Sequence, residues 1–243
     1  MVFTGSKRVP LIANSRWTRD MVVRRFGTAA TSRVVHLGLD HELFAPMSKS
    51  AARKLLGIDD KGKVVVALGA VDVYDQWKGG PIFHELYKAL KDRDDLNLVL
   101  FGNSSEKLPC HKAFGLVRDE RLMPVILNAA DIYVSTASAE SFGQSLLEAS
   151  ACGVPVIAFD VGGVGDIIVQ NETGILVAQQ NLEDLLSAID RLVEAPTERE
   201  RMGRNGRRRV ENEFSLLAQA DAWADCLKEL CLQPGHSIGA PSI

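Results

Sequence analysis

The segment Ser135–Asp160 reads STASAESFGQSLLEASACGVPVIAFD and contains one complete unit of a parallel α/β fold. An apolar strand ends in small polar residues, a loop follows, and a helix begins near Gly143. A second apolar strand starts at Val154. Strands and helices that alternate in this way predict a parallel sheet with helices on both of its faces.

The same alternation extends through most of the chain. Apolar runs predict six strands, at Val64–Ala70, Asn97–Phe101, Phe114–Val117, Asp131–Ser135, Val154–Phe159 and Gly174–Val177. Apolar residues three and four apart predict helices at 80–91, 119–129, 143–152, 182–194, 197–211 and 215–232. Asn181 and Ser215 are expected to cap two of them, and Thr197 a third with Glu200 in a capping box. We therefore expect a Rossmann-like α/β domain built on a six-stranded parallel sheet.

The front of the chain has a different pattern. A short strand at Val9–Ala13 is followed by a helix from Ser15 to Arg25, which Gly27 ends. A strand at Arg33–Leu37 and a small helix at 50–56 come next. Because a lone strand and helix cannot bury their apolar faces, we expect this front part to be the remnant of a larger domain.

Composition excludes several classes of protein. The formal net charge is −3, whereas a general nucleic-acid binder carries a basic excess. There is neither an apolar run of about 20 residues nor the apolar core of a signal peptide, so a cytoplasmic location is expected. The first 35 residues hold seven basic residues against the single acid Asp20. This basic edge suits a solvated face, a contact with a lost domain, or peripheral contact with an anionic membrane or acidic partner.

The loop and helix around Glu140 and Glu148 have the chemistry of a ligand site. In an open α/β sheet, ligands bind beyond the carboxyl ends of the strands. Free N–H groups around Phe142–Ser145 could hold phosphate or sugar oxygens at the helix start. A carboxylate can accept two hydrogen bonds from a vicinal diol such as a ribose. Taken alone, however, two acids at this spacing also fit solvated charges on a helix.

Further motifs point to a family. The segment Glu140–Glu148, with EASACGVPVIA at its end, resembles the E-x7-E segment of retaining GT-B glycosyltransferases of the family 4 type. Motifs of the same family follow in the same order: HLGLDHELFAP at 36–46, Trp77-Lys78-Gly79, Asn97–Asn103, Asn128–Ile132, Gly162-Gly163 and Thr173–Val177. The resemblance implies the C-terminal, donor-binding half of such an enzyme, with the N-terminal half largely missing. Residues 1–32 would be a remnant of the acceptor domain, 33–232 the donor-binding domain and 233–243 a flexible tail.

The resemblance also implies roles for single residues. Glu140 would face the hydroxyls of the donor sugar, Glu148 would bind the ribose, and Lys78 would neutralise the diphosphate as it leaves. The remaining donor-binding residues would be Phe142, Gly143, Gln144, Ser145, Val117, Arg118 and Gly69. Phe142, Gly143 and Gln144 would offer backbone N–H groups, and the loop around Val117 and Arg118 would cradle the base. No metal is required in this family, and neither the cysteines nor the histidines show metal-ligand spacing.

The function implied is transfer of a hexose from a nucleotide-diphosphate sugar to an acceptor hydroxyl with retention, in polysaccharide or glycoconjugate biosynthesis. The acceptor, a glycan or lipid-linked glycan, would be held by the missing N-terminal domain. Two alternatives stay open: a non-catalytic nucleotide-sugar-binding module or subunit of a split enzyme, and a nucleotide-sugar 2-epimerase. The sequence departs from the family at two points. Gly69-Ala70-Val71 lacks the usual arginine, for which Arg118 could substitute, and Asp166 stands where the family has glutamate.

Overall fold

A computed structural model of the chain describes residues 11–27, 32–59, 61–75 and 79–232. Its centre is a parallel sheet with the strand order β5-β4-β3-β6-β7-β8. One half of the sheet contains β3 (Val64–Asp72), β4 (Leu96–Asn103) and β5 (Lys112–Ala113). The other half contains β6 (Ile132–Ser135), β7 (Val156–Phe159) and β8 (Gly174–Val177). The predicted six-stranded α/β fold is confirmed.

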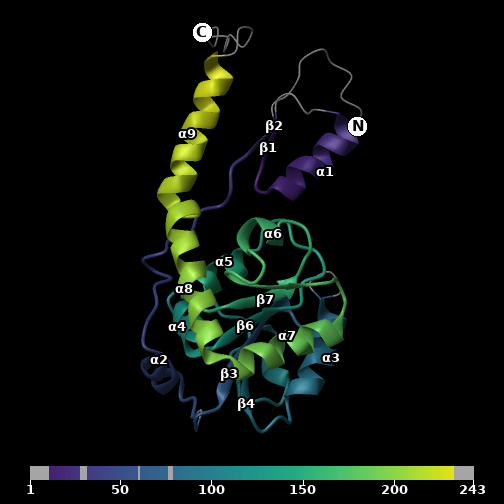
Figure 1. Cartoon of the computed structure of the whole chain (residues 1–243), viewed down its shortest axis with the longest axis vertical. Coiled ribbons are helices and arrows are strands. Elements are labelled where there is room, and N and C mark those ends of the chain that lie inside the picture. Colours follow the sequence, from purple (N-terminus) through teal and green to yellow (C-terminus); the bar gives the residue numbers. More distant parts are fainter. Residues whose placement is uncertain (1–10, 28–31, 60, 76–78, 233–243) are drawn as a thin grey trace.

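Helices pack on both faces of this sheet (Figure 1). They are α2 (Lys49–Leu56), α3 (Gly80–Leu90), α4 (Leu122–Ala129), α5 (Gln144–Ala151), α6 (Val164–Ile167), α7 (Leu182–Glu194) and α8 (Pro196–Glu213), with a 3-10 turn, η2, at Ser105–Lys107. Helix α4 packs against α2 and α5, α5 also packs against α8, and α3 packs against α7. All residues of β6 and β7 are buried, as expected for strands covered on both sides.

The strand order fixes where a ligand can bind. From β3 the chain builds outward through β4 and β5, and then returns to place β6 on the opposite side of β3. This reversal of direction between β3 and β6 is the topological switch point of the sheet. The crevice outside the carboxyl ends of these two strands is therefore the expected ligand site.

The front of the chain forms a separate small unit. Strands β1 (Leu11–Ala13) and β2 (Ser32–Val34) pair in parallel as a two-stranded sheet, and α1 (Arg16–Phe26) connects them. The long helix α9 (Leu216–Leu232) rises beside this unit (Figure 1). An ion pair of 2.6 Å joins Arg33 of β2 to Glu229 of α9. None of the helices in the described part of the chain combines the length and apolar character that a membrane crossing requires.

Two local predictions were wrong. The strand expected at Phe114–Val117 lies earlier, at Lys112–Ala113, because Gly115 adopts a φ of +61° that ends the extended backbone. The helix expected to be capped by Thr197 begins at Pro196 and has no side-chain cap. Proline suits the first helical position because its missing N–H would have no partner there.

Two predicted caps are confirmed. The side chain of Asn181 accepts a hydrogen bond from the Asp184 backbone N–H at 3.0 Å. The hydroxyl of Ser215 accepts one from the Ala218 N–H at 3.1 Å. These short polar side chains satisfy donors that the first turn of a helix leaves unpaired, which is why they could be located from the sequence.

Candidate functional site

The loop between β6 and α5 lies at the switch point. Two glycines, Gly162 and Gly79, allow other segments of backbone to pack directly against it. A Cβ atom on Gly162 would lie 1.7 Å from the backbone oxygen of Glu140, and one on Gly79 would lie 1.6 Å from that of Thr136. The Gly163 N–H donates a hydrogen bond of 2.9 Å to the same Glu140 oxygen. The backbone position of Glu140 is therefore fixed by segments distant in sequence.

Helix α5 begins with backbone donors available to a ligand. Its N-cap is Gly143, with a φ of +111°, and no side chain caps the helix. The first helical bonds run to the Gly143 carbonyl from the N–H groups of Leu146 and Leu147. The preceding N–H groups, those of Gln144 and Ser145, can therefore point at a phosphate or sugar oxygen beyond the helix.

Glu148 lies one turn inside α5 and is an unusual acid. Burial raises the pKa of its carboxyl to about 7, and the nearby negative charge of Glu120 contributes. Since its charge acts on Glu148, Glu120 lies near this carboxyl, and Val117 and Arg118 precede Glu120 in the same loop. A carboxyl that titrates near neutrality beside a free helix N-terminus marks a candidate binding site.

Tyr133 lies near both glutamates. It is fully buried in β6, and its hydroxyl is hydrogen-bonded to the side chain of Ser145. Burial raises the pKa of Tyr133, and the neighbouring charges of Glu148 and Glu140 raise it further. The sequence predicts only a position in a strand for Tyr133. The available signal was its hydroxyl, which must find a partner when the ring is buried.

Gly69 provides the space that this tyrosine occupies. A Cβ at Gly69 would approach the Tyr133 hydroxyl to 2.8 Å and the ring of Phe101 to 2.4 Å. The rings of Phe101 and Tyr133 stack, with their centroids 5.9 Å apart. Gly69 therefore shapes the site through the absence of a side chain.

The structure thus brings most of the predicted residues together. Glu140, Gly143, Gln144, Ser145 and Glu148 lie on the loop and first turns that follow β6. The Phe142 ring is turned away into the core, which leaves only its backbone for a ligand. Val117 packs partly against the core and Arg118 is exposed. Lys78 lies outside the described residues.

Asp166, in α6, binds residues of the front part of the chain. Its carboxylate accepts hydrogen bonds from the Arg16 backbone N–H at 2.7 Å and the Arg16 Nε at 2.9 Å, and pairs with the His36 Nε2 at 2.9 Å. Although burial opposes it, these hydrogen bonds lower the pKa of Asp166. Helix α1 has no acidic residue in its first turn, so Asp166 supplies the negative charge that a helix N-terminus favours.

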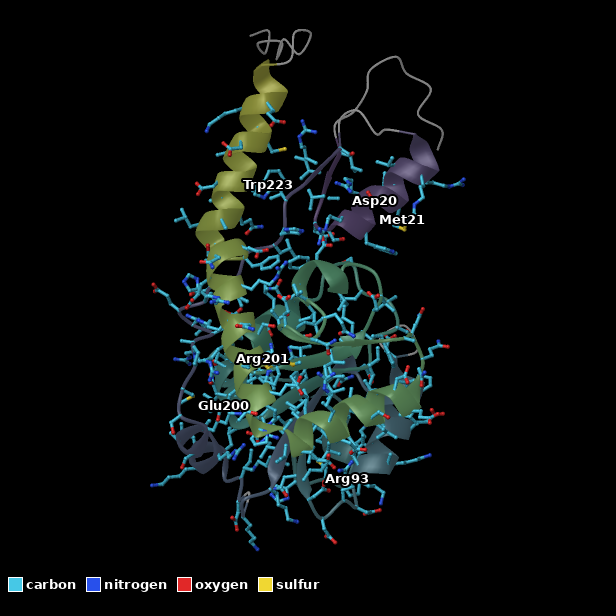
Figure 2. The ribbon with its side chains drawn as sticks, viewed as in Figure 1. Asp20, Met21, Arg93, Glu200, Arg201 and Trp223 are labelled. Carbon is cyan, nitrogen blue, oxygen red and sulfur yellow. The ribbon has the colours of Figure 1, made fainter. Side chains whose placement is uncertain are left out.

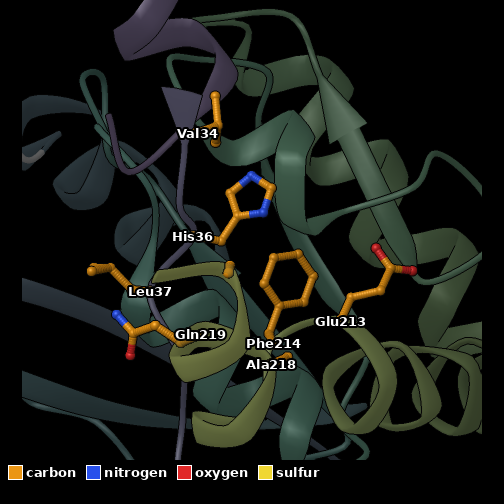
Figure 3. A pocket seen from close by; sticks show the side chains of 8 residues that line it. Val34, His36, Leu37, Glu213, Phe214, Ala218 and Gln219 are labelled. Carbon is orange, nitrogen blue, oxygen red and sulfur yellow. The ribbon is translucent and has the colours of Figure 1, made fainter. Parts of the chain in front are cut away.

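His36 extends this contact to the loop. Its ring stacks on Phe142, with a centroid distance of 5.7 Å, and lies 5.3 Å from that of Phe214. Figure 3 shows His36 beside Phe214 in a small cavity of about 70 Å³. Such a volume is far below that of sites for sugars or nucleotides. The sequence does not predict the roles of Arg16 and His36, since their partner Asp166 lies 150 and 130 residues away.

Replacing Asp166 with asparagine should loosen the front unit. The variant loses the charge that Arg16 and α1 require, so we expect local opening of α1 to become easier by about 1–3 kcal/mol. This stabilisation depends on the ionised carboxylate, and it should therefore fade in the wild-type chain as the pH falls through the lowered pKa of Asp166. Hydrogen exchange of the α1 amides measures the change. The matched control is Asp160→Asn, at an exposed acid; equal protection of α1 in both variants would contradict this role.

Comparisons with known proteins identify the family of this chain. The profile of the family "Glycosyl transferases group 1" matches residues 48–209. The D-inositol 3-phosphate glycosyltransferase of Rhodococcus opacus is 31% identical over an alignment of 232 positions, which covers 87% of this chain and 51% of that protein. The chain therefore spans about half the length of the curated relatives it matches.

Solved structures show the same fold. The Anabaena protein HepE, crystallised with UDP-glucose, is 21% identical with a TM-score of 0.78, over 90% of this chain and 64% of its own. The C-terminal domain of a group 1 glycosyl transferase from Francisella tularensis, LpcC, is 25% identical with a TM-score of 0.63. That match covers 74% of this chain and 100% of the LpcC domain. By its family match and its six-stranded sheet, the chain belongs to the group 1 glycosyltransferases, which have the GT-B fold.

Proposed function

We propose that this chain is the donor-binding, C-terminal half of a retaining glycosyltransferase that uses a nucleotide-diphosphate sugar. One observation carries the proposal: Glu140, the open N-terminus of α5 and the half-buried acid Glu148 meet at the switch point of the sheet. The complete match to the LpcC C-terminal domain supports the assignment to this half.

The site offers one contact for each part of the donor. The Glu148 carboxylate would accept hydrogen bonds from the two ribose hydroxyls. The N–H groups of Gln144 and Ser145 would bind phosphate oxygens, with Lys78 adding positive charge. Glu140 would accept hydrogen bonds from the hydroxyls of the sugar. The base would lie against the loop of Val117 and Arg118, beside Glu148.

The reaction would break the bond between the anomeric carbon and the diphosphate oxygen. The electron pair leaves with the nucleoside diphosphate, whose growing charge is stabilised by Lys78 and the α5 N–H groups. The acceptor hydroxyl attacks the same face of the sugar and forms the new glycosidic bond. Its proton passes to the departing phosphate oxygen. Since Lys78 and the α5 N–H groups would stabilise the charge of the leaving diphosphate, we propose a mechanism that uses no metal ion.

The rest of the enzyme follows from the same proposal. Residues 33–232 would be the donor-binding domain, 1–32 would belong to the acceptor-binding domain, and 233–243 would be a tail. The acceptor, a glycan or lipid-linked glycan, would be held by the other half of the protein. We propose polysaccharide or glycoconjugate synthesis as the setting, since such a donor and acceptor combine there.

Calorimetric titration with UDP, GDP and ADP tests the donor site. We expect one nucleotide to bind, and Glu148→Gln to weaken it by about 1–3 kcal/mol, the range for hydrogen bonds to a charged group. The control is Glu194→Gln, which removes an exposed acid at the end of α7. If no nucleotide binds a folded chain, or both variants bind as the wild type does, the proposal fails.

The affinity for the nucleotide should also depend on pH. Hydrogen bonds from a ribose favour the charged carboxylate, so binding must first ionise Glu148, whose pKa lies at about 7. From about pH 6 to about pH 8 we expect affinity to rise about tenfold and the proton released on binding to disappear. Calorimetry in two buffers of different ionisation enthalpy measures both. Because the nucleotide phosphate titrates as well, only the part of the effect absent from Glu148→Gln belongs to Glu148.

A further inference from the structure

A second, larger cavity opens at the opposite edge of the sheet. Its volume is about 530 Å³, within the range of about 300–1,000 Å³ that is typical of small-molecule sites. Asp131, which precedes β6, and Val154, which precedes β7, both line it. The cavity therefore lies at the amino ends of these strands, a strand length away from the crevice around Glu148.

Positive charge dominates the walls of this cavity. Among the described residues that line it, cationic side chains outnumber carboxylates by five to three. The cations are Lys49, Arg199, Arg204, Arg207 and Arg208, and the carboxylates are Asp131, Glu200 and Glu211. The positive end of the α8 macrodipole, at Pro196, lies in the same wall. Figure 2 locates this helix by the labels on Glu200 and Arg201.

The deepest carboxylate is shared between two cations. Asp131 pairs with Lys49 at 2.7 Å and with Arg53 at 2.6 Å, and it also accepts the Val65 N–H at 2.8 Å. Burial lowers the pKa of Lys49, and the charges of Arg53 and Arg199 lower it further despite the pairing with Asp131. Asp131 is therefore already paired with cations and does not offset the charge of the wall arginines.

Two arginines in the wall of the cavity donate hydrogen bonds to neutral oxygens. Arg199 donates to the backbone oxygens of Leu192 and Val193, and Arg208 donates to the amide oxygen of Asn205 at 3.4 Å. These bonds orient the guanidinium groups, and no carboxylate among the described residues forms an ion pair with either of them. Arginine presents a planar fork of donors that matches a phosphate group.

Arg204 and Arg207 complete the wall in different ways. Arg207 is fixed by the backbone oxygens of His41, Phe44 and Ala151 and by Glu211. Arg204 is exposed. Its ion pair with Glu200, one helical turn away, is weak because the nitrogen and oxygen are 3.6 Å apart in solvent, so the Arg204 side chain can turn toward an anion. Uncharged residues also line the cavity, among them Pro46, Met47, Val154, Pro155 and Pro196.

We propose that this cavity binds an organic phosphate, with the phosphate on Arg204 and Arg208, one helical turn apart on α8, and the uncharged part of the ligand against Met47 and the prolines. The ligand is either a soluble phosphorylated metabolite or the phosphate head group of an anionic lipid. This inference does not depend on the nucleotide site, since the two lie at opposite edges of the sheet.

Binding of glucose 6-phosphate, compared with glucose, tests the proposal for a soluble ligand. We expect the sugar phosphate to bind at low salt, and Arg204→Gln/Arg208→Gln to weaken it at least about tenfold, the loss of two charged contacts. Arg201→Gln is the control, because Arg201 lies on the same helix outside the cavity. Binding must also survive Glu148→Gln, which excludes occupancy of the nucleotide site.

Co-sedimentation with phosphatidylcholine vesicles, with and without phosphatidylglycerol, tests the lipid source. Capture by the anionic vesicles that is lost in the double variant and kept in Arg201→Gln supports a lipid head group. Binding of glucose 6-phosphate without vesicle capture supports a soluble ligand. If neither probe binds, or if the double variant and the control bind alike, the cavity is not a phosphate site and the proposal is overturned.

Discussion

Replacing Glu148 with glutamine is expected to stabilise the chain near pH 8 while it weakens nucleotide binding. The reason is the environment of the carboxyl group: burial and Glu120 raise its pKa to about 7, so its charged form is unfavourable in the folded chain. Glutamine keeps the shape of the side chain and removes the charge. Only a ligand that donates hydrogen bonds to the carboxylate makes the charge favourable.

The sign of the effect on stability follows from linkage. An acid whose pKa is raised by folding costs no stability below its unfolded value, and the cost grows as the pH rises toward its folded value. A shift from 4.5 to about 7 corresponds to about 3 kcal/mol, and screening by solvent reduces this to about 2 kcal/mol. Glu148→Gln should therefore gain about 2 kcal/mol near pH 8 and almost nothing near pH 4.5.

Urea unfolding of the two chains at several pH values measures this gain. Glu194→Gln, at an exposed acid, should change little across the same range. A variant that is destabilised near pH 8 would show that Glu148 has a structural partner, and a gain that is constant with pH would show that charge is not its cause. Stability gained together with affinity lost is the usual mark of a residue kept for binding.

Replacing Gly162 with alanine is expected to disrupt the loop that carries Glu140. The new Cβ would lie 1.7 Å from the Glu140 backbone oxygen, and the φ of Gly162 is +58°, a conformation that side chains disfavour. Backbone cannot yield as a flexible side chain can, so the loop must move. We expect a loss of about 3–5 kcal/mol in unfolding free energy, in the range of exceptional single substitutions.

The same motif contains a matched control for this variant. Gly165 lies three residues away, and a Cβ there would meet its nearest neighbour, the Asp160 Oδ1, at an ordinary 3.7 Å. Gly165→Ala should therefore change stability by less than about 1 kcal/mol. Thermal unfolding and nucleotide titration of both variants test the argument. Equal stability of the two would mean that Gly162 does not constrain the loop.

The sequence predicted the sheet well because the strands have a simple pattern. Runs such as Val64–Ala70 and Val154–Phe159 are apolar throughout, which is required of strands covered on both faces. The errors arose where a single backbone conformation decided the outcome. The left-handed Gly115 ended β5 early, and Pro196 took the helix start assigned to Thr197.

The candidate site was only partly predictable. Glu140 and Glu148 lie on one loop and helix, so their proximity follows from local periodicity. The roles of Tyr133, His36 and Asp166 depend on contacts between segments far apart in the chain, which no local pattern encodes. The Asp166 carboxylate acts at the N-terminus of α1, 150 residues earlier. The cavity at the amino ends of the strands was missed for the same reason, since α2 and α8 meet there only in the folded chain.

The central claim is that a nucleotide binds at the switch point between β3 and β6. Amide chemical shifts in an isotope-labelled chain, followed during titration with the nucleotide that binds in calorimetry, test it directly. We predict that the largest changes occur at Gly143, Gln144 and Ser145, with smaller ones in the loop around Val117. Changes confined to the amino edge of the sheet, around Met47 and Arg204, would contradict the account.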